Sequence, residues 1–395
     1  PAPIGHAPER GVPLDHRGSG LLGDPTQYLG LQGLMEDTTS EAGGLPAMAF
    51  VGFQAAFAIL TVALISGAIA DRVKFSTWMV FAGIWATLVY FPVAHWVFDF
   101  SNDETGHVGG WIANGIEAVD FAGGTAVHIN AGVAGLVLAI IIGKRRGFGR
   151  EPMRPHNLPL VMLGAGLLWF GWFGFNAGSA LGANNTASVV WVNTLVATSA
   201  AILGWLLTER LRDGHATSLG AASGAVAGLV AITPACSALN PIGSIVVGAL
   251  AGVLCALAVG LKYKFGYDDS LDVVGVHLVG GLWGTLAIGF FAVENAPQGA
   301  SGLFDGGGLA LLGTQALGAG AVLLYSAVLT AIIGFALKAV MGWRIPEEDE
   351  VSGIDQHQHA ESGYDLVGSF GGHGPSAGAA AAAKSTTRTS EGAQA

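Results

Sequence analysis

Two histidines lie within long apolar stretches of the sequence, where an ionisable side chain is costly. His128 stands in the segment DFAGGTAVHIN and His277 stands in DVVGVHLVGGLWG. Ionisable residues inside membrane-spanning helices usually mark the path of a substrate, an ion or a proton. One such histidine is as often only a hydrogen-bonding link between helices, but two in similar surroundings favour a functional path.

Each histidine follows an aspartate near the start of its apolar stretch, Asp120 before His128 and Asp272 before His277. A helix rises about 1.5 Å per residue, so the histidines would lie roughly 12 Å and 8 Å beyond these carboxylates. An aspartate at a helix N-terminus usually caps the helix and stabilises it by about 1 kcal/mol. Capping is therefore the first interpretation of both aspartates, and a second role for Asp120 is to stabilise an incoming cation.

Aromatic and hydroxyl side chains recur at helical spacing. In GWFGFNAGSA, Phe175 and Ser179 are four residues apart and share a helix face, and Phe53 and Phe57 have the same spacing in an earlier apolar stretch. A phenyl face attracts a desolvated cation by about 0.5–2 kcal/mol, and a serine oxygen can accept one of its N–H bonds. Taken singly, phenylalanines at this spacing usually only pack against neighbouring helices.

The composition places these residues in a membrane protein. Of the 395 residues, 51% are apolar and 11% are charged, and the mean hydropathy is +0.55, whereas soluble domains carry about 25% charged residues. The 62 glycines suit helices that approach closely in lipid. The net charge of −11 argues against nucleic acid as a partner. Cys236 and Cys255 both lie in apolar stretches, so neither a disulfide framework nor a zinc site is expected.

Nine stretches are long enough to cross the roughly 30 Å hydrocarbon core of a bilayer as helices of about 20 residues. The sequence therefore predicts an all-α, polytopic membrane bundle. The expected spans are 45–70, 76–98, 121–143, 158–180, 187–208, 217–236, 241–261, 272–293 and 309–340. The last of them is long enough to be tilted, kinked or partly outside the membrane.

Between the spans, lysine and arginine occur in alternate loops, which indicates the orientation. They are found at 72–74, 144–154, 210–212, 262–264 and 338–344, whereas 99–120, 181–186, 237–240 and 294–308 contain none. The positive-inside rule then places the N-terminus outside and the C-terminus in the cytoplasm of a cell membrane, such as a bacterial inner membrane. The third and eighth spans, which carry His128 and His277, run in opposite directions, as in an inverted repeat with a central substrate site.

Four regions follow from this division of the chain. We expect residues 1–44 to be an extracellular segment, 45–343 the transmembrane domain and 344–366 a cytoplasmic regulatory tail. Residues 367–395 are rich in Gly, Ala, Ser and Thr and are expected to be a disordered tail. The chain begins at Pro1 without an initiator methionine, which indicates a fragment or a processed chain.

Taken together, the motifs resemble those of the ammonium transporter (Amt) family. DFAGGTAVHIN, RPHNLPL, GWFGFNAGSA, SGAVAGLVAITPAC and DVVGVHLVGGLWG occur in the family's order and are followed by RIPEEDEVSGID. The resemblance runs from Leu45 to Tyr364. It implies a homotrimer with one hydrophobic pore in each subunit, ammonium or ammonia as the substrate, a surrounding lipid bilayer and no cofactor.

The resemblance also implies roles for individual residues. One set would bind ammonium in the outer vestibule: Ser179, Phe57, Phe98, Phe175 and Asp120. Phe57 and Phe175 would in addition form the pore gate, and His128 and His277 would be the twin pore histidines. The resemblance implies no catalytic residue and no metal ligand.

Two features depart from the family's pattern. Family members usually have eleven spans, and the first two are absent before Leu45, a loss that keeps the N-terminus outside. The vestibule tryptophan of many members aligns with Phe98, inside a longer loop, FDFSNDETGHVGGW. Either Trp111 takes the place of that tryptophan or cation binding is weaker.

Other functions stay open on the sequence. A Rhesus-type channel for ammonia or carbon dioxide shares the twin histidines but usually lacks the aromatic cation site that Phe175 and Ser179 suggest. An ammonium sensor would conduct little and signal through its tail. A membrane enzyme fits least, because the sequence has no nucleophile–base pair, HExxH motif or phosphate loop. The segment 344–366 is either a solvated acidic tail or a part of the docking site for a trimeric PII signalling protein.

Overall fold

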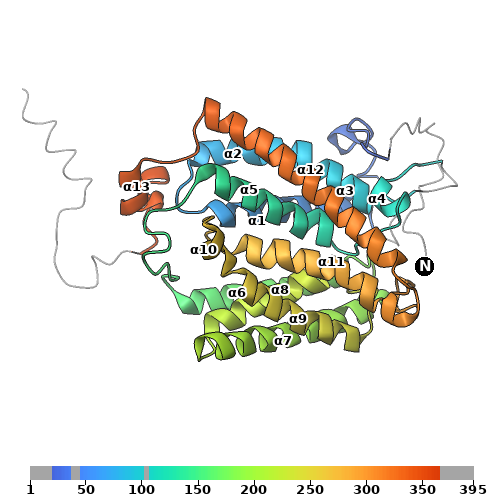
Figure 1. Cartoon of the computed structure of the whole chain (residues 1–395). Coiled ribbons are helices and arrows are strands. Elements are labelled where there is room, and N and C mark those ends of the chain that lie inside the picture. Colours follow the sequence, from blue (N-terminus) through green and yellow to red (C-terminus); the bar gives the residue numbers. More distant parts are fainter. Residues whose placement is uncertain (1–19, 37–44, 102–105, 365–395) are drawn as a thin grey trace, which may run out of the picture.

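Helices make up the regular structure of the described part of the chain, residues 20–36, 45–101 and 106–364 of a computed structural model (Figure 1). The predicted all-α membrane bundle is confirmed in these ranges. The predicted disordered tail, 367–395, lies outside the described residues, as do 1–19 and 37–44 of the predicted extracellular segment.

Eight helices in the described ranges are long and apolar enough to cross a bilayer. They are α1 (Ala47–Ile69), α2, η2 and α3 (Phe75–Trp85, Ala86–Tyr90 and Phe91–Phe98), η3 and α5 (Gly124–Ile129 and Asn130–Ile142), α6 (Leu158–Gly178), α7 (Asn185–Asp213), α9 and α10 (Pro241–Ala258 and Leu261–Phe265), η4 and α11 (Val274–Leu278 and Val279–Phe291) and α12 (Ala310–Val340). The short helices are α4 (Trp111–Asn114), α13 (Glu347–Ser352), α14 (Ile354–Gln358) and the 3-10 turns η1 (Leu29–Leu31) and η5 (Leu303–Asp305).

The sixth predicted span, 217–236, forms a shorter helix than expected. It is α8 (Ser218–Ile232), whose 15 residues correspond to about 22 Å of helix. Pro234 has no N–H with which to continue the helical hydrogen bonds, and the chain continues in turns up to Ala238. All nine predicted stretches thus form apolar helices in the described ranges, eight of spanning length and one shorter and largely buried.

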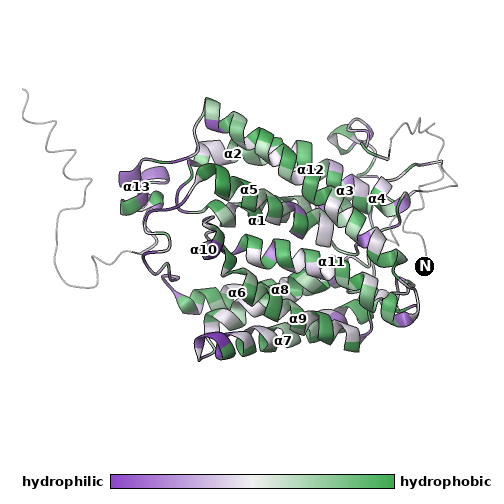
Figure 2. Ribbon diagram, viewed as in Figure 1, coloured by the Kyte–Doolittle hydropathy of each residue, from purple (hydrophilic) through white to green (hydrophobic). Residues whose placement is uncertain are grey.

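Polar residues gather at the two ends of the bundle, with an apolar band between them (Figure 2). α4 lies at one end and α13 at the other (Figure 1). The loops that contain lysine and arginine lie at the α13 end, because every second loop follows a helix that runs in that direction. This arrangement is the one expected of a protein that crosses a bilayer several times.

α12 is one continuous helix of 31 residues, or about 46 Å. It crosses the bundle obliquely (Figure 1), so its extra length is taken up by tilt rather than by a kink.

Near the start of α12, Gln315 supports the chain just before η3. The side-chain oxygen of Gln315 accepts from the backbone N–H of Val119 at 2.7 Å, and its amide donates to the carbonyl of Val119 at 2.7 Å.

The helices that carry the two histidines pack against each other in opposite directions. η3 contacts α11 and η4 contacts α5, so the π-helical start of each span lies beside the α-helical part of the other. In each span a glycine four residues after the histidine permits this approach. A Cβ at Gly281 would lie 2.9 Å from the Cβ of His128, and a Cβ at Gly132 would lie 2.5 Å from the backbone nitrogen of Leu278. The equal spacing in both spans is typical of an inverted repeat.

Gln315→Leu should destabilise the fold by about 2 kcal/mol or more, because it leaves the buried N–H and carbonyl of Val119 without partners. The measurement is thermal unfolding of the purified protein in detergent micelles. Gln32→Leu, at an exposed position, serves as the control and should change the unfolding temperature little. Equal effects of the two substitutions would contradict the supporting role of Gln315.

Candidate functional site

The structure brings His128 and His277 into contact in the interior of the bundle. Their Nδ1 atoms are 3.2 Å apart and their ring centroids are 5.3 Å apart. His128 has no exposed surface and His277 is 8% exposed. Two helices that begin at opposite ends of the bundle therefore place one histidine each at the same interior point.

The contact between the two Nδ1 atoms constrains the protons of the pair. One Nδ1 must donate and the other must accept. The ring that donates, when neutral, presents a bare Nε2, and the ring that accepts presents an Nε2–H. Nε2 of His128 is buried and has no hydrogen-bond partner among the described residues. A buried polar atom without a partner costs about 1–3 kcal/mol, so this position suits a small ligand that exchanges one hydrogen bond with the ring.

Aromatic rings enclose His128 on the side of α6. The ring of Trp172 stacks on it at a centroid distance of 5.6 Å and an angle of 17°, and Phe175 lies at 6.2 Å. Phe57 of α1 stacks on Phe175 at 4.4 Å and 24°. A stacked phenyl pair from two helices therefore covers the buried histidine.

Ser179 and Phe98 extend this group toward the α4 end of the bundle. The hydroxyl of Ser179 donates to the carbonyl of Phe175 at 2.8 Å, which leaves lone pairs of the serine oxygen as acceptors. Phe98 meets Phe57 edge to face, at a centroid distance of 6.2 Å and an angle of 79°. The predicted vestibule residues of α1, α3 and α6 thus form one continuous set, with a hydrogen-bond acceptor beside phenyl rings.

Asp120 is engaged as a helix cap. Its oxygens accept from the backbone N–H groups of Gly123, Gly124 and Thr125 at 2.7–2.8 Å, and also from the hydroxyl of Thr125. The carboxylate is 8% exposed. These hydrogen bonds are the ones expected of a capping residue. Any effect of Asp120 on a cation would be a long-range electrostatic one.

The counterpart of Asp120 in the second span is Asp269. Its oxygens accept from the backbone N–H groups of Val273 and Val274 at 3.1 and 2.7 Å. Asp269 precedes His277 by eight residues, the same separation as between Asp120 and His128. Both histidine helices therefore begin on a buried carboxylate in the same position.

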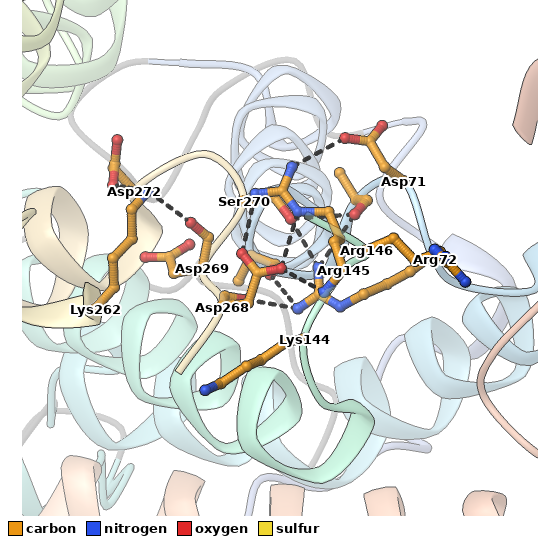
Figure 3. Close-up of polar contacts among 12 residues, drawn as sticks. Asp71, Arg72, Lys144, Arg145, Arg146, Lys262, Asp268, Asp269, Ser270 and Asp272 are labelled. Atoms are coloured by element: carbon orange, nitrogen blue, oxygen red, sulfur yellow. Dashed lines mark hydrogen bonds and ion pairs between the residues drawn. The ribbon is translucent and has the colours of Figure 1, made fainter. Parts of the chain in front are cut away.

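The sequence analysis assigned that place to Asp272, and the structure corrects it. Asp272 instead forms an ion pair with Lys262 at 2.7 Å (Figure 3). The physical reason is the spacing of the cap. Asp269 accepts from the N–H groups four and five residues later, and Asp120 from those three to five residues later. Asp272 stands only one and two residues before Val273 and Val274, and its carboxylate pairs with the ammonium of Lys262 instead.

Trp111, considered as a substitute for the vestibule tryptophan, packs on Trp96 with ring centroids 5.7 Å apart. Both rings belong to the apolar cluster that also includes Phe98. The indole Nε1 of Trp111 is buried and lacks a hydrogen-bond partner within the described ranges. Its part in cation binding stays a prediction.

Trp172 is a site residue that the sequence analysis missed. Its indole N–H donates to the hydroxyl of Thr233 at 2.8 Å, which holds the ring against His128. The sequence did indicate its position, because Trp172 lies three residues before Phe175 in the same GWFGFNAGSA motif and so shares its helix face.

Among the described residues no group of three or more His, Cys, Asp or Glu side chains could hold a metal ion.

Comparison with known proteins identifies the family. Residues 19–364 match the Ammonium Transporter Family. The chain belongs to this family. A relative named "Ammonium transporter" from Mycobacterium tuberculosis is 61% identical over 367 residues, and another of the same name from Aquifex aeolicus is 50% identical over 351 residues. These alignments cover 88% of this chain and 77% and 78% of the two relatives.

Solved structures of the ammonium transporter family share the fold. The crystal structure of Mep2 from Saccharomyces cerevisiae matches with a TM-score of 0.74 and 33% identity, covering 84% of this chain and 74% of that one. A protein called "Sensor Amt Protein" matches with a TM-score of 0.75 and 28% identity, covering 86% and 82%. The family consists of transporters rather than enzymes, which confirms the prediction that the protein is not an enzyme.

Gly281→Ala should separate the histidine helices, because its Cβ would lie 2.9 Å from the Cβ of His128. Such overpacking costs about 1–3 kcal/mol, and we expect both the unfolding temperature and substrate uptake to fall. Gly320→Ala in α12 is the matched control, since nothing lies within 4 Å of its added Cβ. Uptake that is equally unaffected in both variants would show that the close approach at Gly281 is dispensable.

Asp269→Asn tests the cap of the second span through pH. Burial raises the pKa of Asp269 to about 6, above the ordinary 3.8, so its bound proton stabilises the fold below pH 4 and this contribution is lost as pH rises through 6. The unfolding free energy of the wild type minus that of the variant should therefore fall between pH 4 and 7, by on the order of 1–3 kcal/mol, and stay constant above.

Chemical unfolding in detergent micelles over this pH range provides the measurement. Asp305→Asn is the control, since Asp305 is exposed and accepts from the N–H of Glu294 in a surface loop. A difference between wild type and Asp269→Asn that does not change with pH would rule out titration of this carboxyl.

Proposed function

We propose that this protein transports ammonium across a membrane, binding the cation at an outer aromatic site and passing neutral ammonia along His128 and His277. The observation that carries the proposal is the unpartnered Nε2 of His128, buried behind the stacked rings of Phe57 and Phe175. Family membership supports the same substrate, because the relatives from Mycobacterium tuberculosis and Aquifex aeolicus are named ammonium transporters.

Recruitment in this proposal uses the group around Ser179. The serine oxygen accepts one N–H bond of the cation, and phenyl rings of Phe57, Phe98 and Phe175 attract its charge. Asp120 contributes at a distance, because its negative charge is buried beneath the same end of η3. The side chains are apolar apart from the serine, so each contact favours a cation that has shed part of its water.

Passage beyond the gate requires loss of the charge. Phe57 and Phe175 stack with their ring centroids 4.4 Å apart. Their apolar faces cannot replace the water around an ion, and a bare ion in such surroundings costs many kcal/mol. Ammonium can release a proton and continue as ammonia, whereas potassium cannot. The apolar gate therefore selects by chemistry as well as by size.

The histidine pair then forms hydrogen bonds with the neutral ammonia molecule. Because the two Nδ1 atoms share a hydrogen bond, in a neutral pair one Nε2 accepts and the other donates. These two groups match the N–H groups and the lone pair of ammonia. An imidazole can also pass a proton between its nitrogens, so the pair is a candidate route for the proton that ammonium releases.

Assembly and location are parts of the same proposal. We propose a homotrimer in a cell membrane, with the α4 end outside and the α13 end in the cytoplasm, and PII as a partner of the segment 344–366. The exposed apolar side chains of α6, including Leu163, Leu167 and Phe170, support burial of that helix in lipid or against another subunit.

A sensor is the second candidate function, supported by the similarity to the protein called "Sensor Amt Protein". A sensor would bind ammonium at the same outer site and conduct little. Transport measurements separate the two, because a sensor retains binding without flux.

Uptake of labelled methylammonium into proteoliposomes tests the proposed transport. We expect saturable uptake by the wild type, a loss of about tenfold or more in His128→Ala, since the pore loses a hydrogen-bonding partner, and normal uptake in His215→Ala, an exposed histidine. Ser179→Ala should raise the half-saturating concentration more than it lowers the maximal rate. Potassium flux equal to the methylammonium flux would contradict the deprotonation step, and binding without uptake would favour the sensor.

A further inference from the structure

A basic cavity lies at the α13 end of the bundle, away from the proposed pore. Its volume is about 310 Å³. It is formed where the loop after α5 meets the segment that leads into α13. The lining residues are Lys144, Arg145, Arg146, Arg344, Ile345, Glu347 and Glu350.

Arg145 anchors the loop and is not free to bind a ligand. Its guanidinium pairs with Asp268 at 3.0 Å and with Asp71 at 3.1 Å, and its backbone N–H donates to Asp268 at 2.7 Å (Figure 3). Burial opposes ionisation of Asp268, but the bonds from Arg145 outweigh it and lower the pKa of Asp268. Lys144 extends away from this cluster (Figure 3) and has no carboxylate partner among the described residues.

The opposite wall is held by backbone pairing. Residue 344 pairs with Val73 in a short antiparallel bridge, and the N–H of Lys74 donates to the carbonyl of Trp343 at 2.8 Å. The guanidinium of Arg344 donates to the carbonyl of Lys144 at 2.6 Å. The backbone of both walls is thus fixed to the membrane bundle, and it holds the exposed Lys144 and Arg146 side chains beside Arg344.

A carboxylate of the chain itself already occupies the cavity. One oxygen of Glu350 accepts from the backbone N–H of Arg146 at 2.8 Å, and the other pairs with the guanidinium of Arg344. The Glu350 side chain is 5% exposed. Glu347, whose side chain is exposed, pairs with the guanidinium of Arg146 alone. The site therefore binds anionic oxygen through a backbone N–H and a guanidinium, and α13 supplies the occupant.

We propose that this cavity is a binding site for a phosphate-bearing anion, which exchanges with the Glu350 carboxylate. Without the two glutamates, Lys144, Arg146 and Arg344 leave three positive charges around one backbone donor. A guanidinium presents paired N–H groups that match phosphate oxygens as well as carboxylate oxygens. The volume lies at the lower limit of about 300–1,000 Å³ for ligand pockets, which suits a diphosphate or a phosphorylated headgroup.

Glu350 and Glu347 pair with Arg344 and Arg146 and leave Lys144 without a carboxylate, whereas a doubly charged phosphate would engage all three cations. The cavity opens at the end of the bundle that is proposed to be cytoplasmic. A soluble phosphate ester and the headgroup of an anionic phospholipid offer the same chemistry there. Occupation by either would release Glu350, and with it α13, from the loop after α5.

Titration calorimetry with inorganic pyrophosphate on the full chain in uncharged detergent tests the proposal. We expect saturable binding to the wild type and affinity about tenfold higher in Glu350→Gln, because the amide pairs less strongly with Arg344. Lys144→Gln combined with Arg146→Gln should weaken binding by about tenfold or more. Arg150→Gln is the matched control, since Arg150 is exposed on the same loop and outside the cavity. Each variant is compared by thermal unfolding to show that it is folded.

Two outcomes would overturn the proposal. The first is the absence of saturable binding to folded Glu350→Gln. The second is an equal loss in Arg150→Gln and in the double variant, which would indicate only general attraction to a basic loop. Repeating the titration in nanodiscs identifies the source of the anion. If phosphatidylglycerol competes with pyrophosphate and phosphatidylcholine does not, the site binds lipid. If neither lipid competes, the site binds a soluble ligand. None of these readouts depends on transport.

Discussion

The structure depends on two buried carboxylates that begin the two histidine helices inside the protein. A helix whose first turn is buried has backbone N–H groups without water partners, and each would cost about 1–3 kcal/mol if nothing else accepted its hydrogen bond. Asp120 takes up three of these N–H groups and Asp269 takes up two. Because each carboxylate stands eight residues before its histidine, the cap also determines where along the helix the imidazole is placed.

The meeting of the histidines then follows from backbone packing. Each histidine is followed four residues later by a glycine at the crossing of the two helices, so that His128 lies against Gly281 while Gly132 lies against Leu278. Side chains at these points would force the helices apart, and the 3.2 Å contact between the Nδ1 atoms would be lost. The same arrangement, repeated in opposite directions, yields a pair in which each ring orients the proton of the other. This mutual orientation is a property of the pair and cannot be assigned to either histidine alone.

Much of the fold could be predicted from the sequence because hydrophobic length is a local property. Eight of the nine predicted stretches form spanning helices, and the exception, α8, ends where Pro234 removes a hydrogen bond. The site was harder to predict from the sequence, because its contacts join distant parts of the chain. The residues around Trp172 in the sequence do not show that it stacks on His128. Its spacing to Phe175 indicates only that the two rings share a face of α6. Asp272 was chosen over Asp269 because hydropathy marks the start of a span only to within a few residues, whereas the carboxylate that caps the helix is identified by its hydrogen bonds.

The loop from Asp268 to Asp272 links the basic cavity to η4, the start of the helix that carries His277. Asp268 binds Arg145 of the loop after α5, Asp269 caps η4, and Asp272 pairs with Lys262. Adjacent residues of a short loop cannot move independently, so a displacement of Arg145 is transmitted to the cap of the helix that carries His277. Any occupant of the cavity that shifts the loop after α5 therefore also acts on the start of the helix that carries His277. A tail that binds this cavity through Glu350 is in a position to influence the histidine pair without touching it.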